Sequence, residues 1–386
     1  MKIVQTNKAY APWIGGMETI VTVLAEGLSA KPGVTVEALV CNGQRSFVRD
    51  VQTRNGVQVT YLPRWGFVSS LPISPTFPFA LGRVEGDILH VHEPFPLVDL
   101  SVAAFPRIRR HFKRIVVTYQ SDIVRQKWAL RMYRPFIHNF LSIADRILVS
   151  SPALIESSEF LPLYRDRCEI VPLGVNLEWT RNRAARSGRV QEIRRRQGTP
   201  LILFVGRLVY YKGLEYLVDA MARIPGGKLV IVGSGPLQGE LERQIRSVRC
   251  ADRITILPHL DSEELYAYYE ACDVFVLPST EKTEAYGLVQ VEAMASGKPV
   301  VSTEIGTGTT FVNQHGITGL TVPPRDAASL ATAVGTLLHD ADLRVQLGRQ
   351  AEERAMKEFT THQMVERVYH IYQKLLDTTA AGHSPA

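Results

Sequence analysis

Residues 273–300 decide the fold of this chain, because a strand, a polar loop, a helix and a second strand follow one another there. The stretch begins with the apolar run Asp273-Val274-Phe275-Val276-Leu277-Pro278, which predicts a buried parallel strand. After a polar loop it continues as Glu284-Ala285-Tyr286-Gly287-Leu288-Val289-Gln290-Val291-Glu292-Ala293-Met294-Ala295-Ser296-Gly297-Lys298-Pro299-Val300. Gly297 is placed to end the helix, and Pro299 prevents it from restarting. The order of elements therefore predicts an α/β fold.

Two glutamates of this stretch are candidates for ligand binding. Glu284 falls in the loop at the carboxyl end of the strand, and Glu292 falls inside the helix. Open α/β sheets bind ligands at the carboxyl ends of their strands, so both carboxylates are expected at one crevice. Gly287 would allow a ligand to approach the helix N-terminus closely. The alternative is that Glu284 is solvated and Glu292 is a capping or ion-paired residue, which is usual near helix starts.

A second motif supplies positive charge. It reads Phe204-Val205-Gly206-Arg207-Leu208-Val209-Tyr210-Tyr211-Lys212-Gly213 and follows the first strand of a second strand–helix series. Two cations five residues apart in a strand-to-helix loop can converge on one diphosphate. Fixed cations stabilise the charge that develops on a nucleoside diphosphate when a sugar–phosphate bond breaks. Either cation alone would be interpreted as solvated, but the combination with the two glutamates favours catalysis.

The length of the chain suits two domains. Its 386 residues exceed one ordinary core, and 45% apolar with 21% charged residues is typical of a globular protein. We predict an N-terminal domain over residues 1–178, a linker over 179–199 and a C-terminal domain over 200–360. Each domain is predicted to be doubly wound and Rossmann-like, and the two are expected to face each other across a cleft. The linker is inferred from a polar, poorly apolar composition.

Two glycine-containing loops are further candidates for ligand binding. Gly15 and Gly16 lie between the first strand and the first helix, where backbone amides approach a phosphate or a sugar hydroxyl. The run Gly233-Ser234-Gly235-Pro236 also follows a strand. Neither is a dinucleotide fingerprint, because the third glycine is missing, and a pair of glycines alone is a weak signal.

Polar residues at strand ends of the first domain are further candidates for ligand contacts. His92 and Glu93 end a strand, and Gln120 and Asp122 follow the next one. The pair His90 and His92 would suggest a metal site, but no third ligand is evident, so structural or ligand-binding roles are favoured. Asp122 is equally well explained as a helix N-cap.

Charge and cysteine content limit the function classes further. The net charge of +6 is concentrated in three clusters, around residues 107–114, 125–134 and 189–196. A phosphorylated substrate or an anionic lipid surface explains such an excess better than nucleic acid, since no nucleic-acid-binding motif accompanies it. The cysteines Cys41, Cys168, Cys250 and Cys272 are scattered and are expected to be reduced. Neither a membrane span nor a secretory signal is evident, and a cytoplasmic location is expected.

The two motifs resemble the retaining glycosyltransferases of family four, which have the GT-B fold and two glutamates separated by seven residues. The resemblance covers nearly the whole chain and is strongest over residues 201–301. It implies catalysis by Arg207, Lys212 and Glu284 without a metal ion or other cofactor, and a helix at 361–378 that packs back on the first domain. It also implies donor binding by a larger set: Gly15, Gly16, Gly206, Gly233, Gly235, Pro236, Tyr286, Gly287, Leu288, Val289 and Glu292.

The resemblance also assigns contacts to the acceptor or to the transferred sugar to His92, Glu93, Gln120 and Asp122. Relatives often have a histidine at the position of Gln120, and a glutamine can form hydrogen bonds but cannot carry a proton. The implied substrates are a nucleotide-sugar, with GDP-mannose favoured, and a glycan or lipid-linked glycan acceptor. A UDP-sugar donor, a nucleotide-sugar epimerase and a non-catalytic binding protein remain alternatives. The basic residues Lys127, just before the predicted helix at 128–143, and Arg131 and Arg134 within it are interleaved with the apolar Trp128, Leu130, Met132 and Phe136. This pattern predicts an interfacial helix, or else an ordinary core helix with a solvated face.

Overall fold

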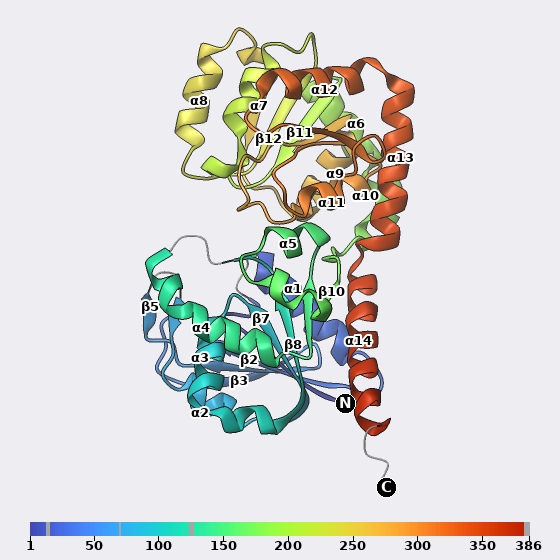
Figure 1. The fold of residues 1–386 in the computed structure, drawn as a ribbon. Helices are drawn as coiled ribbons and strands as arrows, with labels where there is room; N and C mark the ends of the chain where they lie inside the picture. The colour runs from blue at the N-terminus through green and yellow to red at the C-terminus, as the bar shows by residue number, and fades with distance from the viewer. Residues whose placement is uncertain (13–15, 69–70, 123–126, 382–386) are drawn as a thin grey trace. The chain divides into compact units, whose positions relative to one another are not determined.

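The computed structural model describes residues 1–12, 16–68, 71–122 and 127–381, which form two compact α/β units (Figure 1). Side chains are not described for residues 16–17, 127–130 and 378–381 either. Unit 1 comprises Met1–Gly174 and Thr361–Ala386, and unit 2 comprises Val175–Thr360. The chain therefore leaves unit 1, completes unit 2 and returns.

Unit 1 is built on an eight-stranded sheet in the described residues. Neighbouring strands are parallel except β3, which pairs antiparallel with β4. In spatial order the strands are β10 (Cys168–Ile170), β9 (Arg146–Val149), β8 (Phe112–Tyr119), β7 (Gly86–Glu93), β1 (Lys2–Asn7), β2 (Thr35–Cys41), β4 (Val57–Leu62) and β3 (Asp50–Arg54). A separate antiparallel hairpin consists of β5 (Gly66–Val68) and β6 (Leu71–Ile73).

Helices cover this sheet, and the core lies between them and the apolar strands (Figure 1). The helices are α1 (Gly16–Ser29), α2 (Phe77–Leu81), α3 (Pro96–Ala104), α4 (Lys127–Ile143), α5 (Pro152–Ser157) and α14 (Thr361–Ala381), with 3-10 turns η1 (Pro106–His111) and η2 (Leu161–Arg167). The last helix, α14, packs on α1, and Lys31 at the end of α1 forms an ion pair with Glu366.

Unit 2 contains a six-stranded sheet in which every pairing is parallel. The spatial order is β13 (Ile254–Leu257), β12 (Lys228–Val232), β11 (Leu201–Val205), β14 (Val274–Leu277), β15 (Val300–Thr303) and β16 (Gly319–Val322). All residues of β11 and β14 are buried, as expected for central strands that helices cover on both faces. The strand order reverses between β11 and β14, which gives the sheet a Rossmann-like switch point.

The helices of unit 2 alternate with these strands. They are α6 (Arg183–Gln197), α7 (Leu214–Met221), α8 (Gln238–Ser247), α9 (Ser262–Ala271), α10 (Leu288–Ala295), α11 (Thr309–Val312), α12 (Ala327–His339) and α13 (Ala341–Glu358), with 3-10 turns η3 (Glu178–Asn182), η4 (Tyr210–Lys212) and η5 (Ala251–Arg253). The two doubly wound units confirm the predicted fold class.

The predicted linker at 179–199 is wrong, because α6 occupies most of it and packs on α9 within unit 2. Arg186 explains the error: a residue type expected at the surface is buried, and its guanidinium lies 2.6 Å from the Glu270 carboxylate. In unit 1, α3 ends at Ala104 because Pro106 starts a 3-10 turn.

The cysteines are free, as predicted: Cys168 is half-buried and the others, Cys41, Cys250 and Cys272, are buried. No described helix is both long and apolar enough to cross a bilayer.

Candidate active site

The sheet order of unit 2 brings the two sequence motifs together. The Arg207–Lys212 loop follows β11 and the Glu284 loop follows β14, and these strands are neighbours in the sheet although about 70 residues separate them in sequence. The loop after β12 lies on the other side of β11. Three loops that were predicted to bind the donor therefore leave adjacent parallel strands at the same edge.

Lys212 and Glu284 form a buried ion pair, in which the Lys212 ammonium donates a hydrogen bond to Glu284 Oε2. The Ser279 hydroxyl donates to the same oxygen at 3.0 Å. The Thr307 hydroxyl donates to the Glu284 carbonyl oxygen at 2.7 Å. The carboxylate is therefore held in a fixed orientation. Because an ammonium has three donors, Lys212 can keep this contact and still bind a phosphate oxygen.

Two glycines allow these loops to approach each other and the helices. Gly213 has φ +63°, and a Cβ there would lie 2.2 Å from the Pro278 carbonyl oxygen. Gly287 has φ +73° at the N-cap of α10, where a Cβ would lie 2.6 Å from Leu277 Cδ2. A side chain at either position would separate the β11 loop from the β14 loop or move the start of α10.

The loop after β12 is tied to the arginine loop by backbone hydrogen bonds. Leu208 N donates to the Ser234 carbonyl oxygen at 3.0 Å, and Gly206 N donates to the Val232 carbonyl oxygen at 3.0 Å. Arg207 itself is exposed, so its guanidinium is accessible to a ligand. The remaining predicted donor contacts of this loop, Gly233, Gly235 and Pro236, lie beside it.

Glu292 lies in α10 and is oriented by a residue that the sequence did not suggest. The Tyr269 hydroxyl donates to Glu292 Oε2 at 2.6 Å. Burial raises the pKa of Glu292, and the Tyr269 hydrogen bond offsets part of that rise. Tyr286, Leu288 and Val289 surround the start of the same helix, and Tyr286 is buried.

In unit 1, the two histidines of β7 are interior residues. His90 and His92 are fully buried and their rings lie 4.3 Å apart. His90 Nε2 is 2.7 Å from the Thr118 hydroxyl, and His90 Nδ1 is 2.5 Å from the Tyr372 hydroxyl of α14. Burial lowers the pKa of His92 to about 3 and that of His90 well below its usual value, so both rings are neutral near pH 7.

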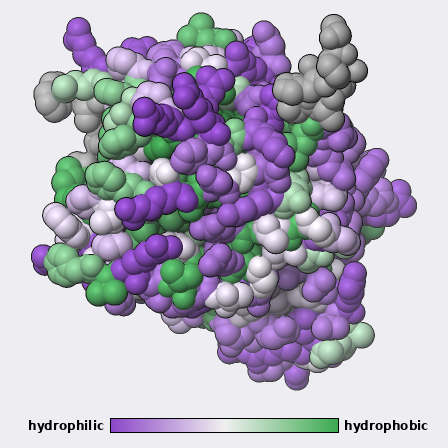
Figure 2. Space-filling model, turned by 90° about the horizontal axis from the view of Figure 1, so that it is seen from below, coloured by the Kyte–Doolittle hydropathy of each residue, from purple (hydrophilic) through white to green (hydrophobic). Residues whose placement is uncertain are grey.

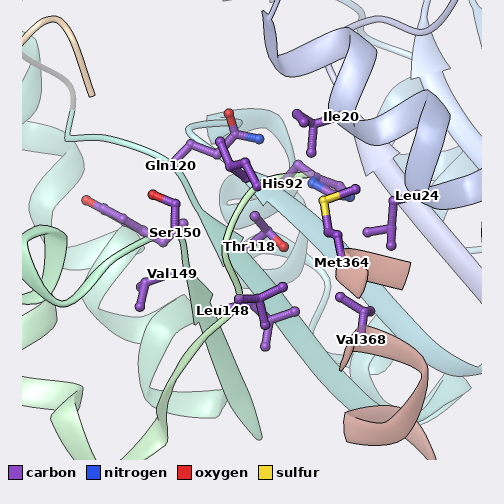
Figure 3. A pocket seen from close by; sticks show the side chains of 13 residues that line it. Ile20, Leu24, His92, Thr118, Gln120, Leu148, Val149, Ser150, Met364 and Val368 are labelled. Carbon is purple, nitrogen blue, oxygen red and sulfur yellow. The ribbon is translucent and has the colours of Figure 1, made fainter. Parts of the chain in front are cut away.

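His92 and Gln120 line a small cavity in unit 1 (Figure 3). The cavity has a volume of about 20 Å³, enough for one water molecule, and Ile20 and Met364 close its apolar side. Both ring nitrogens of His92 and Nε2 of Gln120 are buried without a hydrogen-bond partner among the described residues. A water between these groups would satisfy them and link Gln120 to His92.

Glu93 is turned inward and belongs to a buried carboxyl pair with Asp99. Glu93 Oε2 accepts a hydrogen bond from Phe95 N at 2.7 Å, and the Tyr133 hydroxyl donates to Asp99 Oδ2. Burial raises the pKa of both carboxyls, most strongly that of Asp99, where the Glu93 charge adds to the effect. Two carboxyls buried together favour a state in which they hold one proton between them, because two charges in one buried site repel.

Asp122 also has partners within its own unit. It accepts hydrogen bonds from the Tyr119 hydroxyl at 2.6 Å, the Ser158 hydroxyl at 2.7 Å and Glu159 N at 2.8 Å. These contacts favour a structural role over an acceptor contact. Gly15 lies outside the described residues, and of Gly16 the structure describes only the backbone, at the start of α1.

The third basic cluster does not form a free anion-binding surface. Arg189 pairs with Glu264 at 2.6 Å, and Arg194 pairs with Asp273 at 3.3 Å. Arg196 donates to the Tyr268 hydroxyl at 2.9 Å. These contacts join α6 to α9 and to the start of β14. The described residues contain no group of three or more His, Cys, Asp or Glu side chains that could hold a metal ion.

Known protein families match both units. The profile of Glycosyltransferase Family 4 matches residues 14–179, and that of Glycosyl transferases group 1 matches residues 189–354. O-antigen chain mannosyltransferase C of Escherichia coli is 32% identical over 388 residues, which cover 98% of this chain and 100% of the relative. The chain belongs to glycosyltransferase family 4.

Another family 4 relative is D-rhamnosyltransferase WbpZ of Pseudomonas aeruginosa, 36% identical over 281 residues that cover 72% of this chain and 70% of the relative. Among solved structures, sucrose-phosphate synthase from Thermosynechococcus elongatus matches with a TM-score of 0.73 and 25% identity over 98% of this chain and 99% of that one. The predicted GT-B fold and the glycosyltransferase activity of the chain are thereby confirmed.

Three residues of the candidate site escaped the sequence analysis: Ser279, Thr307 and Tyr269. Ser279 had a usable signal, since it is polar and follows the strand that leads to Glu284. Thr307 and Tyr269 had none, because they come from segments whose position depends on how the sheet is assembled.

Proposed function

We propose that the protein is a retaining, metal-independent hexosyltransferase that moves mannose from GDP-mannose to a glycan or lipid-linked glycan during cell-surface polysaccharide synthesis. The observation that supports it most directly is the Lys212–Glu284 ion pair between the loops after β11 and β14. In the proposed complex, Arg207 and Lys212 bind the diphosphate and the N-terminus of α10 faces it.

The same pair connects the two ends of the reacting bond. Glu284 would accept hydrogen bonds from hydroxyls of the transferred sugar, while Lys212 stabilises the charge of the leaving phosphate. Glu292, oriented by Tyr269, would hold the ribose hydroxyls. Because Lys212 contacts Glu284 directly, correct placement of the sugar and of the diphosphate depend on each other.

Retention is favoured by the lack of an available base at the predicted acceptor contacts in the described part of unit 1. The low pKa of His92 reflects burial, Glu93 faces Asp99, and Asp122 already accepts three hydrogen bonds. An inverting transfer needs a general base to deprotonate the acceptor. When the leaving phosphate accepts that proton, the acceptor attacks from the face the phosphate leaves, and the configuration is kept.

The two relatives favour a manno-configured sugar. One is a mannosyltransferase of an O-antigen chain and the other a D-rhamnosyltransferase, and D-rhamnose is D-mannose without its 6-hydroxyl. A cell-surface polysaccharide as the product follows from the same names. We extend the proposal to reversible contact with an anionic membrane, where a lipid-linked acceptor would lie.

The experiment is to incubate the protein with GDP-mannose, GDP-D-rhamnose, UDP-glucose and UDP-galactose and to measure release of the nucleoside diphosphate. Release from GDP-mannose that persists in EDTA supports the proposal, and complete loss in EDTA contradicts metal independence. The anomeric configuration of the product, read by NMR, tests retention. If nucleoside diphosphate is released only from a UDP-sugar, the donor is that UDP-sugar and not GDP-mannose. If it is released from none of the nucleotide-sugars, a non-catalytic binding protein is favoured.

A further inference from the structure

Six apolar side chains are exposed together at one edge of unit 1, on the loop at residues 42–49 and on the β5–β6 hairpin. With their exposed fractions they are Phe47 (63%), Val48 (71%), Trp65 (49%), Phe67 (58%), Val68 (60%) and Ile73 (38%). We call these six residues, with Arg45 and Arg49, the β5–β6 surface. Consecutive strand residues point to opposite faces, so exposure of both Phe67 and Val68 means that neither face of β5 is covered.

The loop and the hairpin are joined into one structure. Ser46 and Arg64 exchange backbone hydrogen bonds of 2.9 and 2.8 Å, and Trp65 N donates to the Ile73 carbonyl oxygen at 2.9 Å. The Arg64 guanidinium donates to backbone oxygens of the loop and lies 4.0 Å from the centre of the Phe67 ring. Phe47 and Trp65 bring the two segments together, with ring centres 6.3 Å apart. The exposed side chains are therefore held in a defined arrangement.

The charged residues within the loop and the hairpin segment are all arginines. Arg45 is exposed and lies 5.4 Å from the centre of the Phe47 ring, and Arg49 is exposed at the end of the same loop. Residues 42–49 and 63–75 contain no Asp or Glu. Arg64 is buried and serves as the internal support described above, so Arg45 and Arg49 are the cations available to a partner.

We propose that the β5–β6 surface binds an anionic lipid bilayer, with the apolar side chains in the headgroup–acyl boundary and Arg45 and Arg49 on anionic headgroups. Contiguous exposed apolar surface marks an interaction site, and an apolar patch with arginines is complementary to an anionic interface. A glycan would use the aromatic rings but has no need of the aliphatic side chains Val48, Val68 and Ile73. The purpose of this contact, access to a lipid-linked acceptor, rests on the proposed function.

Helix α4 competes as the membrane contact. Its Met132 and Phe136 are 65% and 38% exposed, but Arg134 forms a 2.6 Å ion pair with Glu159. The side chains of Lys127, Trp128 and Leu130, which the sequence analysis placed on the interfacial face, lie outside the described residues. Figure 2 shows hydrophobic residues lying among hydrophilic ones over the face seen there, so exposure alone does not select one surface. The arginine pair and the uncovered hairpin favour β5–β6.

The test uses the full chain with phosphatidylcholine vesicles, with or without phosphatidylglycerol, at low salt. The wild type is expected to sediment with the anionic vesicles only and to be released by high salt. Arg45→Gln with Arg49→Gln should weaken binding about fivefold per arginine. Phe67→Ser with Val68→Ser should weaken it on the order of tenfold or more.

Matched controls come from unit 2. Val345 and Met356 on α13 are 69% and 42% exposed, so V345S with M356S removes similar apolar area elsewhere. Arg243 and Arg246 on α8 are exposed, and replacing both by glutamine matches the lost charge. Both control proteins should bind as the wild type does.

Tryptophan quenching by lipids brominated on their acyl chains distinguishes the hairpin from α4. Trp65→Phe should remove most of the quenching, whereas Trp128→Phe should leave the quenching unchanged. The reverse result would assign the contact to α4 and overturn the proposal. Equal binding by the hairpin variants and the wild type, or equal binding to both vesicle types, would also overturn it.

Two further measurements separate this proposal from other outcomes. Sedimentation velocity without lipid would reveal a dimer that the hairpin variants dissociate, and that result would make the surface an interface between copies. Slow hydrolysis of GDP-mannose in water should be unchanged in the hairpin variants. If it is missing in every protein while vesicle binding follows the expected pattern, the proposed donor fails and the lipid contact stands.

Discussion

Both units present polar side chains at the carboxyl ends of parallel strands, but they use them differently. In unit 2, Lys212 and Glu284 lie in loops beyond the strand ends and contact each other. In unit 1, His92 and Glu93 are the last residues of β7 itself, and both are fully buried. Residues in the loops beyond a strand can contact a ligand, whereas residues at the end of the strand itself contact other groups of the protein interior.

This difference indicates that the polar groups of the two units have different roles. The polar groups of unit 2 are fixed charges suited to a leaving diphosphate. Those of unit 1 are buried, and their hydrogen bonds join β7 to β8, β7 to α14, and α3 to α4. We therefore expect substitutions in unit 2 to change turnover and substitutions in unit 1 to change stability first.

The largest effect is expected for Lys212→Ala. Turnover should fall on the order of 10²–10³-fold, because the change removes charge from the leaving group and frees Glu284. Arg207→Ala should behave similarly, and steady-state release of nucleoside diphosphate measures both. Exposed Lys282 in the Glu284 loop provides the control, since Lys282→Ala removes a nearby cation that the ion pair does not use. If the turnover of Lys212→Ala stays within a fewfold of wild type, the proposed difference in role between the two units is contradicted.

The second effect concerns the buried carboxyl pair of unit 1. Because the pKa of Asp99 is raised in the folded state, the native protein holds a proton that the unfolded chain has lost, and stability falls as pH rises. The free energy of unfolding should fall by about 1.4 kcal/mol per pH unit. This dependence begins at ~4, the pKa of the carboxyl group in the unfolded chain, and ends at its raised pKa in the folded protein. Urea unfolding at pH 5 to 8 should show a shallower slope for Asp99→Asn than for the wild type.

Asp87 supplies the opposite control. The hydrogen bond from Lys113 lowers the pKa of Asp87 most, and the hydrogen bond from Lys2 N lowers it further. Asp87 therefore stabilises the folded protein above the carboxyl pKa of the unfolded chain, and this contribution is lost as the pH falls. Asp87→Asn should therefore leave the slope between pH 5 and 8 unchanged. An Asp99→Asn protein with the wild-type slope would show that the pair does not share a proton.

A smaller effect is expected for Tyr269→Phe. Loss of the hydrogen bond to Glu292 should weaken binding of the nucleoside diphosphate about tenfold, since hydrogen bonds to carboxylates are worth about 1.5 kcal/mol or more. If Glu292 holds the ribose, the loss should shrink for a 2′-deoxy or 3′-deoxy nucleotide. Calorimetry with the three nucleotides measures this. A loss of equal size for all of them would indicate a merely structural tyrosine.

The smallest effect is expected for Gln120→Ala. It removes one neutral hydrogen-bonding group, worth about 1 kcal/mol, so turnover should fall about fivefold. Gln120→Asn, which keeps the amide, serves as the comparison. A loss as large as that of Lys212→Ala would mean that unit 1 takes part in the chemistry after all.

The fold followed from the sequence wherever apolar runs alternate with helical periods, as in β11 and β14. The prediction of a linker at residues 179–199 was wrong, because Arg186 is buried in an ion pair with Glu270, a residue far away in the sequence. The motifs of the candidate site were visible because they lie next to strands. The contact between Lys212 and Glu284 was not, since it depends on the order of strands in the sheet.

The return of α14 to unit 1 determines the order in which a newly made chain can finish folding. A ribosome releases residues at about 5–20 per second, so all of unit 2 emerges before the last helix of unit 1 exists. Until then His90 lacks its Tyr372 partner, and Met364 and Val368 are missing from the wall of the small cavity. Unit 1 of the nascent chain stays open along α1 until α14 has been made, while unit 2 can already be complete. Truncation before Thr361 should thus leave unit 2 folded and unit 1 vulnerable to proteolysis.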